Sequence, residues 1–410
     1  MAELLADSAT LPEPKETETE TETETSKIPF TTQLLTYMGN KRKLLPHIRD
    51  TIYHVSDALG GRPISFADPF SGSGVVARLA FTCSRVNHIA ANDIAHYAHL
   101  CNLCYLQPSP SPTTRQLVHS LIDRANALPD PDTEDQWIAR HWAPANDADI
   151  QPGERCYFTR ENALRIDAIR NFIASDEVPC GLKPFLLAPL LIQASIHNNT
   201  NGQFAAFYKN EAGVGAFGGK RAIDTKRITK RIVLPYPLYL HEFRDPDCSR
   251  PCVSLSRKDA RQWAIQSRTT ATIDLLYLDP PYNKHPYNIY YFLLDIIATW
   301  DKTIDIPASY RGQPKGWLRS PFNSSVDAHS ALRDVVRDAN ARFVALSYYD
   351  AGILAPATID ALLAEFGEVQ RFPVSQSVYN KLYGLGAHKR DSMDTAPAKE
   401  YLWLLRKHVV

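Results

Sequence analysis

An acid, two prolines and a tyrosine stand in succession at positions 279 to 282, directly after an apolar stretch. The stretch, Ile273 to Leu278, predicts a buried strand that ends at Asp279-Pro280-Pro281-Tyr282. The prolines stiffen the backbone and lack N–H donors, so nearby carbonyls remain available as acceptors. A carboxylate and a carbonyl can accept both hydrogens of an exocyclic amine, while a tyrosine ring stacks on the ring that carries it. A plain proline turn is the alternative, but the flanking Asp and Tyr favour a site for an aromatic amine.

A glycine-rich turn follows a second apolar strand candidate, Ile64 to Phe70. Gly72 and Gly74 permit a tight strand-to-helix turn and close approach of the backbone to a ligand, and Ala77 completes a G-x-G-x-x-A spacing. The next strand candidate ends at Asp93, 21 residues beyond Gly72, where an acid can accept hydrogen bonds from ribose hydroxyls. The pattern predicts a cofactor that contains adenosine, either a dinucleotide or another molecule of that class.

The order of these motifs resembles that of the amino-methyltransferases of DNA, above all the Dam-like adenine methyltransferases of restriction–modification systems. The resemblance extends over residues 36–405, and it includes the aromatic-Gly-x-Lys segment near the start and the acid of the segment 256–260. It implies S-adenosylmethionine as cofactor and adenine N6 in double-stranded DNA as the methyl acceptor. The catalytic residues that it implies are Asp279, Pro280, Pro281 and Tyr282. The cofactor-binding residues that it implies are Tyr37, Lys41, Asp68, Pro69, Phe70, Gly72, Gly74, Asp93 and, against the adenine, Asp259.

Several alternatives stay open at this point. Relatives commonly carry a histidine near positions 291 and 292, where this chain has Tyr291 and Phe292. Cytosine N4 and glutamine N5 methyltransferases use the same amine chemistry but have Ser or Asn in place of Asp279. An RNA adenine methyltransferase, or a non-catalytic DNA-binding regulator on the same scaffold, also fits the motifs. A nicotinamide dehydrogenase would leave the Asp-Pro-Pro-Tyr sequence unexplained.

Residues that can contact DNA gather between the cofactor motifs and the catalytic motif. Seven basic residues lie between positions 209 and 231 against two acids, in a glycine-rich loop followed by a short helix over Asp224–Ile232. Asn and Gln side chains just upstream suit base edges, and Lys and Arg suit phosphates. A later glycine-rich basic loop is either a second backbone contact or a plain exposed loop. The predicted DNA contacts are Asn201, Gln203, Lys209, Lys220, Arg221, Lys226, Arg227, Lys230, His388, Lys389 and Arg390.

Composition is that of a globular enzyme, with 44% hydrophobic and 22% charged residues in 410. The net charge is zero, but the charged residues are unevenly distributed. Residues 1–27 hold eight acids and two lysines, so the rest of the chain carries a net charge of +6. No apolar run reaches 18 residues and no secretory signal is visible, so we expect no membrane span and a cytoplasmic, bacterial-type enzyme. Seven cysteines, an odd number, suggest reduced thiols, and we expect packing and no metal at Cys101-x-x-Cys104.

The fold expected from these elements is an α/β protein, a doubly wound mixed sheet of the class I methyltransferase, Rossmann-like type. A mainly helical target-recognition domain is expected as an insert at 114–245, between catalytic segments 28–113 and 246–410. Residues 1–27, with their Glu-Thr repeat, are expected to be a disordered acidic tail. The last two strands, 366–373 and 400–406, are expected to pair antiparallel. We expect a monomer, and a cognate restriction endonuclease stays open as a partner.

Overall fold

The computed structural model describes residues 34–35, 41, 44–107, 110–243, 248–316, 320–374 and 400–408. The predicted acidic tail, Tyr37 and the basic positions His388, Lys389 and Arg390 lie outside the described residues.

Seven strands form one mixed sheet in the order β3-β2-β1-β4-β5-β7-β6. All neighbouring strands pair in parallel except β7, which is antiparallel to both β5 and β6. The predicted α/β class with a mixed sheet is therefore confirmed, as is the antiparallel terminal pair. The strands are β1 Ile64–Asp68, β2 Val86–Asn92, β3 Cys252–Ser256, β4 Ile273–Leu278, β5 Ala341–Tyr349, β6 Gly367–Val374 and β7 Glu400–Lys407.

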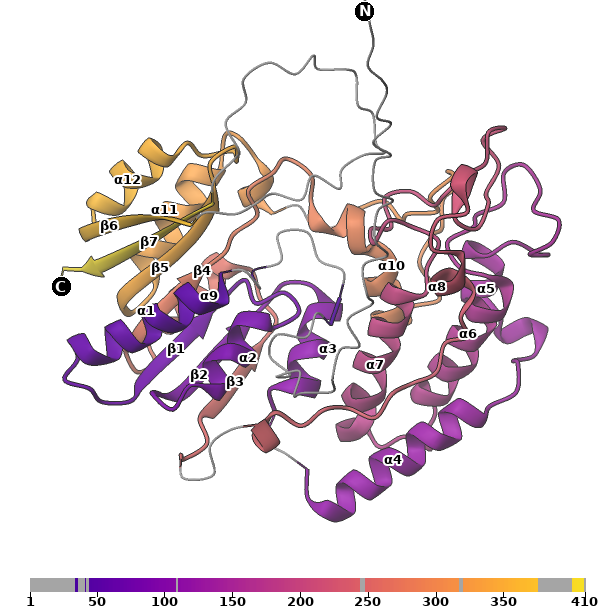
Figure 1. Ribbon diagram of the computed structural model, residues 1–410, viewed down its shortest axis with the longest axis horizontal. Helices are drawn as coiled ribbons and strands as arrows, with labels where there is room; N and C mark the ends of the chain where they lie inside the picture. Colours follow the sequence, from indigo (N-terminus) through magenta and orange to yellow (C-terminus); the bar gives the residue numbers. More distant parts are fainter. Residues whose placement is uncertain are drawn as a thin grey trace, which may run out of the picture.

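Strand β4 lies at the centre of the sheet and is buried along its whole length. Its side chains alternate between two hydrophobic layers: Leu275 and Tyr277 join one cluster, and Leu276 and Leu278 join the other. Helices cover both faces of the sheet, which explains why the strand is a continuous apolar run (Figure 1). Helices α1 Leu45–Ala58 and α2 Val75–Thr82 cover the first face, and α9 Ala260–Ser267, α11 Ala328–Asp338 and α12 Pro356–Ala364 cover the second.

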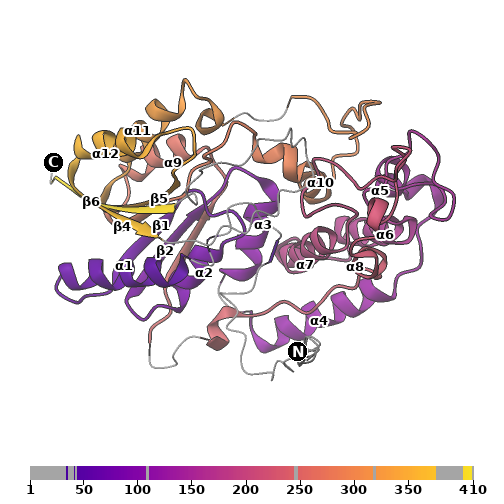
Figure 2. The same cartoon turned by 45° about the horizontal axis from the view of Figure 1, so that its top comes forward.

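The remaining helices pack together beside the sheet rather than on it (Figures 1 and 2). They are α3 His96–Tyr105, α4 Pro112–Ala127, α5 Trp137–Trp142, α6 Arg160–Ala174, α7 Lys183–Ile196, α8 Thr225–Thr229 and α10 Tyr287–Thr299. Apart from α8, they share one hydrophobic core, which contains residues of α3 and α10 as well as residues of the helices in the predicted insert.

Helix α6 connects this assembly through buried charges at the ends of its neighbours. The Asp167 carboxylate accepts from the N–H groups of Ile138 and Ala139, at 2.7 and 2.9 Å, at the start of α5. Arg170 Nε donates to the carbonyl of Ile297 near the end of α10, at 2.7 Å. Both charges satisfy backbone groups that a helix end leaves without an internal partner. The position of α10, which follows the predicted catalytic motif, is thus tied to α6.

The predicted basic helix over Asp224–Ile232 is shorter than expected, because α8 ends at Thr229. Asn162 on α6 donates to the carbonyl of Lys230 at 3.0 Å and accepts from the N–H of Ile232 at 2.8 Å. These bonds hold the backbone extended where the sequence analysis expected the helix to continue. In the described part of the chain, no helix has the length and apolar character needed to cross a membrane.

Candidate functional site

Three acids meet at one edge of the sheet, where strands β1, β2 and β4 end. Asp68 ends β1, Asp93 follows β2 and Asp279 follows β4. Because β1 pairs in parallel with both β2 and β4, their carboxyl ends lie side by side. The strand order reverses between β1 and β4, which is the point at which doubly wound sheets bind ligands. The three motifs separated in sequence therefore form one site.

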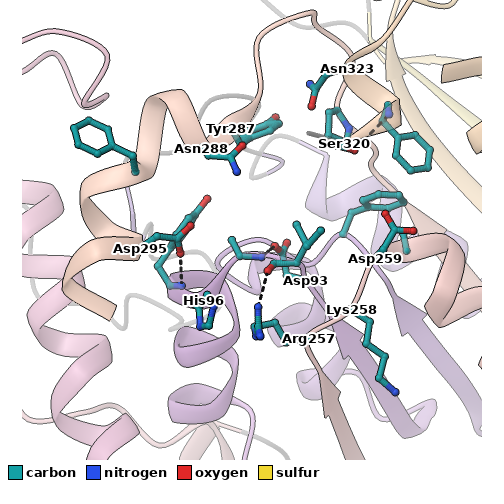
Figure 3. Close-up of a pocket in the computed structure, with 18 of the residues that line it drawn as sticks. Asp93, His96, Arg257, Lys258, Asp259, Tyr287, Asn288, Asp295, Ser320 and Asn323 are labelled. Carbon is teal, nitrogen blue, oxygen red and sulfur yellow. Dashed lines mark hydrogen bonds between the residues drawn. The ribbon is translucent and has the colours of Figure 1, made fainter. Parts of the chain in front are cut away.

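A cavity of about 390 Å³ opens at this edge. Its walls include Phe70, Asp93, Asp259, Asp279 and Pro281, all of which belong to the predicted motifs or their flanks. Figure 3 shows Asp93 and Asp259 on one side of the cavity, with Tyr287 and Asn288 of α10 across from them. The ring of Phe70 packs edge-on against Phe322 at 5.0 Å and gives part of the wall an apolar surface.

The glycine turn is held in place by Asp93. Its Oδ2 accepts from the N–H of Gly72 at 2.8 Å, and its Oδ1 accepts from the N–H of Ala95 at 2.9 Å. Gly74 adopts φ +81°, and a Cβ atom there would lie 2.3 Å from Asn102 Oδ1. The turn thus has no room for a side chain at this position. The two oxygens of a carboxylate offer about four lone-pair sites, so Asp93 can still accept from a hydroxyl group of a ligand.

The acidic edge carries closely spaced negative charge. Burial raises the pKa of Asp68 well above its usual value, and the neighbouring charges of Asp279 and Asp93 add to the shift. Burial also raises the pKa of Asp93, although its bonds to backbone N–H groups oppose the change. An edge of this kind disfavours an anionic ligand and favours a cationic one.

Asp279, the acid of the predicted catalytic motif, is anchored through one oxygen. Lys41 Nζ lies 3.0 Å from Oδ1, and the Ser347 hydroxyl donates to the same atom at 3.3 Å. Tyr277 continues this chain, with its hydroxyl 2.8 Å from Ser347 Oγ. Within the described residues, Oδ2 carries no such partner, which leaves it available to a substrate. Burial raises the pKa of Asp279 to about 6, while Lys41 lowers it and Glu400 raises it.

Lys41 lies under the catalytic motif rather than in the cavity wall. Its ammonium forms ion pairs with Asp279 and with Glu400, the first residue of β7. Burial acts to lower the pKa of Lys41, but these two carboxylates outweigh it, so the pKa is raised well above its usual value. The predicted role of Lys41 in cofactor binding stays a prediction. Its observed contacts orient Asp279 and place one positive charge between the carboxylates of Asp279 and Glu400.

Tyr282 is held in place by the strand next to its own. Its ring contacts Tyr348 edge-on at 6.2 Å and Tyr349 at 5.8 Å, both at the end of β5. Its carbonyl accepts from the N–H of Ile353 at 2.9 Å, and Lys41 Nζ lies 5.6 Å from the ring centroid. The ring therefore has a set orientation beside Asp279.

Some residues of the site carry no motif that sequence analysis could recognise. Glu400 is one, since it meets Lys41 across 359 residues of sequence. Asp295 is another: it lines the cavity and accepts from the N–H of Tyr97 at 3.1 Å, and burial raises its pKa to about 7. Its signal in the sequence was an isolated acid in the otherwise uncharged helix α10. Arg257, Lys258 and His96 also line the cavity and were missed (Figure 3).

The predicted DNA contacts that are described are exposed, apart from Arg227 and Gln203, which are half-buried. Arg227 is half-buried and donates to the carbonyls of Asn198 and Thr200, at 3.0 and 3.1 Å. It thereby holds the segment that precedes the other candidates. Asn201, Lys209, Lys220, Arg221, Lys226 and Lys230 are exposed, and Gln203 is half-buried. Contact of these residues with DNA stays a prediction.

Comparison with known proteins adds an independent finding. Residues 37–215 match the family of D12 class N6 adenine-specific DNA methyltransferases. Type II methyltransferase M.NlaIII of Neisseria lactamica is 26% identical over 389 residues, which cover 91% of this chain and 99% of the relative. Type II methyltransferase M.CviAII of Paramecium bursaria Chlorella virus 1 is 26% identical over 341 residues, or 82% and 89% of the two chains.

A third relative, type II methyltransferase M.FokI of Planomicrobium okeanokoites, is 23% identical over 92% of this chain and 53% of its own length. No solved structure matches the chain significantly. The matched family model includes Lys41, the glycine turn and Asp93, and the alignments to the first two relatives extend over most of both chains. Over residues 37–215 the chain is thus similar to the D12 class of N6 adenine-specific DNA methyltransferases, and over most of its length it is similar to type II methyltransferases.

Proposed function

We propose that this chain is the modification methyltransferase of a type II restriction–modification system. It transfers a methyl group from S-adenosylmethionine to N6 of an adenine flipped out of duplex DNA. The observation that carries the proposal is Asp279, anchored through Oδ1 beside the oriented ring of Tyr282, at the wall of a cavity that is also lined by Asp93, the acid that holds the glycine turn. The names of the relatives, which are type II methyltransferases, support the biological context.

The residues of the cavity fit the cofactor. Asp93, Asp259 and Phe70 line the cavity. In this proposal Asp93 accepts from the ribose hydroxyls, Asp259 accepts from the adenine amine, and Phe70 provides an apolar wall. The acidic edge supports S-adenosylmethionine over a dinucleotide, because a pyrophosphate would add negative charge beside Asp68 and Asp93, whereas the sulfonium and α-ammonium groups are cationic. When bound, the cofactor supplies a methyl group that is activated for attack by its positively charged sulfur.

Asp279 and the Pro280 carbonyl are the acceptors for the two N6 hydrogens of the target base. With Oδ1 held by Lys41 and Ser347, Asp279 presents Oδ2 without having to reorganise. Hydrogen bonds to both N6 hydrogens draw the nitrogen lone pair out of conjugation with the ring, which makes the amine a better nucleophile. Flipping the base costs a few kcal/mol. Stacking on Tyr282 recovers about 1–3 kcal/mol of that cost.

Recognition of the DNA sequence belongs to the helical assembly. We propose that helices α4 to α8 form the target-recognition insert over 114–245, with the exposed polar and basic residues of 201–230 turned to the DNA. The shared core with α3 and α10 would make this insert a rigid extension of the catalytic region. The enzyme acts as a monomer, and a restriction endonuclease that recognises the same sequence is its expected partner.

Methyl transfer tests the proposal directly. Labelled S-adenosylmethionine is offered with unmethylated duplex DNA, RNA or protein, and the products are digested for nucleoside mass analysis. N6-methyladenine in duplex DNA alone is the expected result, with the Asp279→Ala enzyme as the inactive control that still binds the cofactor. Label in RNA or in protein would show that the substrate is that molecule and not DNA. Cofactor binding without transfer to any acceptor would support a regulatory protein instead.

A further inference from the structure

An aromatic side chain with two cations lies on the surface between the helical assembly and the segment that follows α10. Tyr310 is 47% exposed, with Lys209 Nζ 4.8 Å and the Arg311 guanidinium carbon 5.2 Å from its ring centroid. Arg311 Nε also donates to the Tyr310 hydroxyl at 2.7 Å. The two cations come from segments about 100 residues apart in sequence and meet on one ring.

Neither cation is neutralised by a described carboxylate. Many other surface cations of the described chain form ion pairs, such as Arg231 with Glu161 at 2.8 Å and Arg333 with Glu365 at 2.7 Å. Lys209 and Arg311 have no such pair among the described residues, and cation–π contact leaves their charge unneutralised. Two adjacent positive charges without a carboxylate form a site for an anion.

The cluster is rigidly mounted. Arg155 donates to the carbonyls of Pro307 and Ser309, at 2.6 and 2.9 Å, and so ties the loop that carries Tyr310 to the helical assembly. Gly312 is buried with φ +60°, and a Cβ atom there would lie 2.5 Å from the Arg155 guanidinium carbon. On the other side, the Tyr310 ring contacts the buried Phe207 at 6.5 Å. The anion site is thus organised before any ligand binds.

The same loop leads directly to the cavity. Gln313 donates to the carbonyl of Asn288 at 3.1 Å, and Pro314 and Lys315 line the cavity wall. Pro314 follows Tyr310 by four positions, so their Cα atoms lie at most about 14 Å apart. Phosphates repeat every ~3.4 Å of helix axis along each DNA strand. A strand whose base enters the cavity therefore passes the cluster within a few nucleotides.

We propose that Lys209 and Arg311, held on the ring of Tyr310, form a clamp for the phosphodiester backbone of the DNA strand next to the target adenine. The clamp rests on the proposed function, because it requires that nucleic acid approach the cavity. It adds Tyr310 and Arg311 to the proposed DNA-binding surface and assigns Lys209 a contact with a backbone phosphate. Such a contact positions the strand and carries no sequence information of its own.

The test is equilibrium binding of a labelled duplex that contains the target sequence, measured by fluorescence anisotropy over a series of salt concentrations. The slope of log K against log salt concentration is negative, and each lost phosphate contact reduces its magnitude by about 0.9. We expect a decrease of about 1 for Lys209→Ala or Arg311→Ala and about 2 for the double variant. Affinity for S-adenosylmethionine, measured by calorimetry, should stay at the wild-type level and report an intact cavity.

Two further variants separate the clamp from general charge effects. Lys302→Ala is the matched control, since Lys302 lies 5.1 Å from the Trp300 ring in the same segment but pairs with Asp135 at 3.9 Å. We expect its salt slope to equal that of the wild type. Tyr310→Phe keeps the ring and should retain most of the magnitude of the salt slope. Tyr310→Leu removes the ring and should reduce that magnitude about as much as Lys209→Ala or Arg311→Ala alone.

A double variant with the slope and affinity of Lys302→Ala would overturn the clamp. That result leaves the proposed function intact if the wild-type enzyme methylates DNA. A wild-type enzyme that transfers no methyl group to DNA would overturn the proposed function, and the clamp with it.

Discussion

Replacing Glu400 with Gln removes one of the two carboxylates that share the Lys41 ammonium, and it should change the pH dependence of catalysis. In the proposed mechanism methyl transfer needs Asp279 as a carboxylate, so the activity of the wild type should fall as pH falls through about 6, the pKa that burial, Lys41 and Glu400 set for this group. The groups that influence this titration are Lys41, Asp68, Tyr277, Tyr282, Ser347 and Glu400. Glu400 is a positioning residue here, because it acts through Lys41.

The magnitude follows from the geometry of the ion pairs. Both carboxylates contact the same ammonium, so their charges lie on the order of 5 Å apart, and at an effective dielectric constant of about 20 they repel by about 3 kcal/mol. That energy corresponds to about 2 pKa units. Some of the repulsion is screened by solvent and by movement of Lys41, so Glu400→Gln should shift the acid limb down by about 1–2 pH units.

The assay is kcat/KM for duplex DNA against pH, which reports ionisations of the free enzyme. Glu365→Gln is the matched control, because Glu365 pairs with Arg333 at 2.7 Å on the surface, away from the cavity. Lys41→Met supplies the reciprocal test: without the cation, the pKa of Asp279 rises and the acid limb moves above that of the wild type. An acid limb that stays in place in both Glu400→Gln and Lys41→Met would refute the coupling between these residues.

The other predictions concern single positions. Burial raises the pKa of Asp279 to about 6 from 3.8, so its carboxylate costs the fold about 3 kcal/mol above pH 6, and this cost disappears as pH falls toward 3.8. Asp279→Asn should therefore raise Tm at pH 8 but not at pH 4 while abolishing transfer, and an unchanged Tm at pH 8 would count against this cost. Tyr282→Ala should weaken the flipped complex by about 1–3 kcal/mol, seen as lower 2-aminopurine fluorescence at the target base, and an undiminished signal would exclude the stacking role. Gly74→Ala should abolish cofactor binding in calorimetry, whereas Gly153→Ala, also at positive φ but with open space around it, should bind normally; equal binding by both would show that the turn tolerates a side chain. Asp167→Ala should lower the free energy of unfolding in urea by about 2–3 kcal/mol, since buried N–H groups lose their acceptor, and a loss below 1 kcal/mol would contradict its capping role.

Much of the catalytic edge could be predicted because its parts are local. A continuous apolar run followed by Asp-Pro-Pro-Tyr indicates a buried central strand with a polar end, and β4 has that form. The sequence analysis did not predict strand β3, because it lacks a strong hydrophobic pattern. Cys252–Ser256 is a short, partly exposed strand at the edge of the sheet. The predicted helix over Asp224–Ile232 ended early because hydrogen bonds from Asn162, distant in sequence, replaced its last turn.

From residue types and spacing alone, the sequence predicts the proposed chemistry: an amine-binding motif at Asp279, a glycine turn with its acid at Asp93, and through them the resemblance to DNA adenine methyltransferases. These features depend on residue type and local spacing, which a chain carries before it folds. Which groups surround these motifs depends on the tertiary structure. Lys41 and Glu400 meet Asp279, and Lys209 meets Tyr310, through contacts between segments far apart in sequence. Their charges act over a few ångströms in space, and spacing along the sequence does not encode such distances.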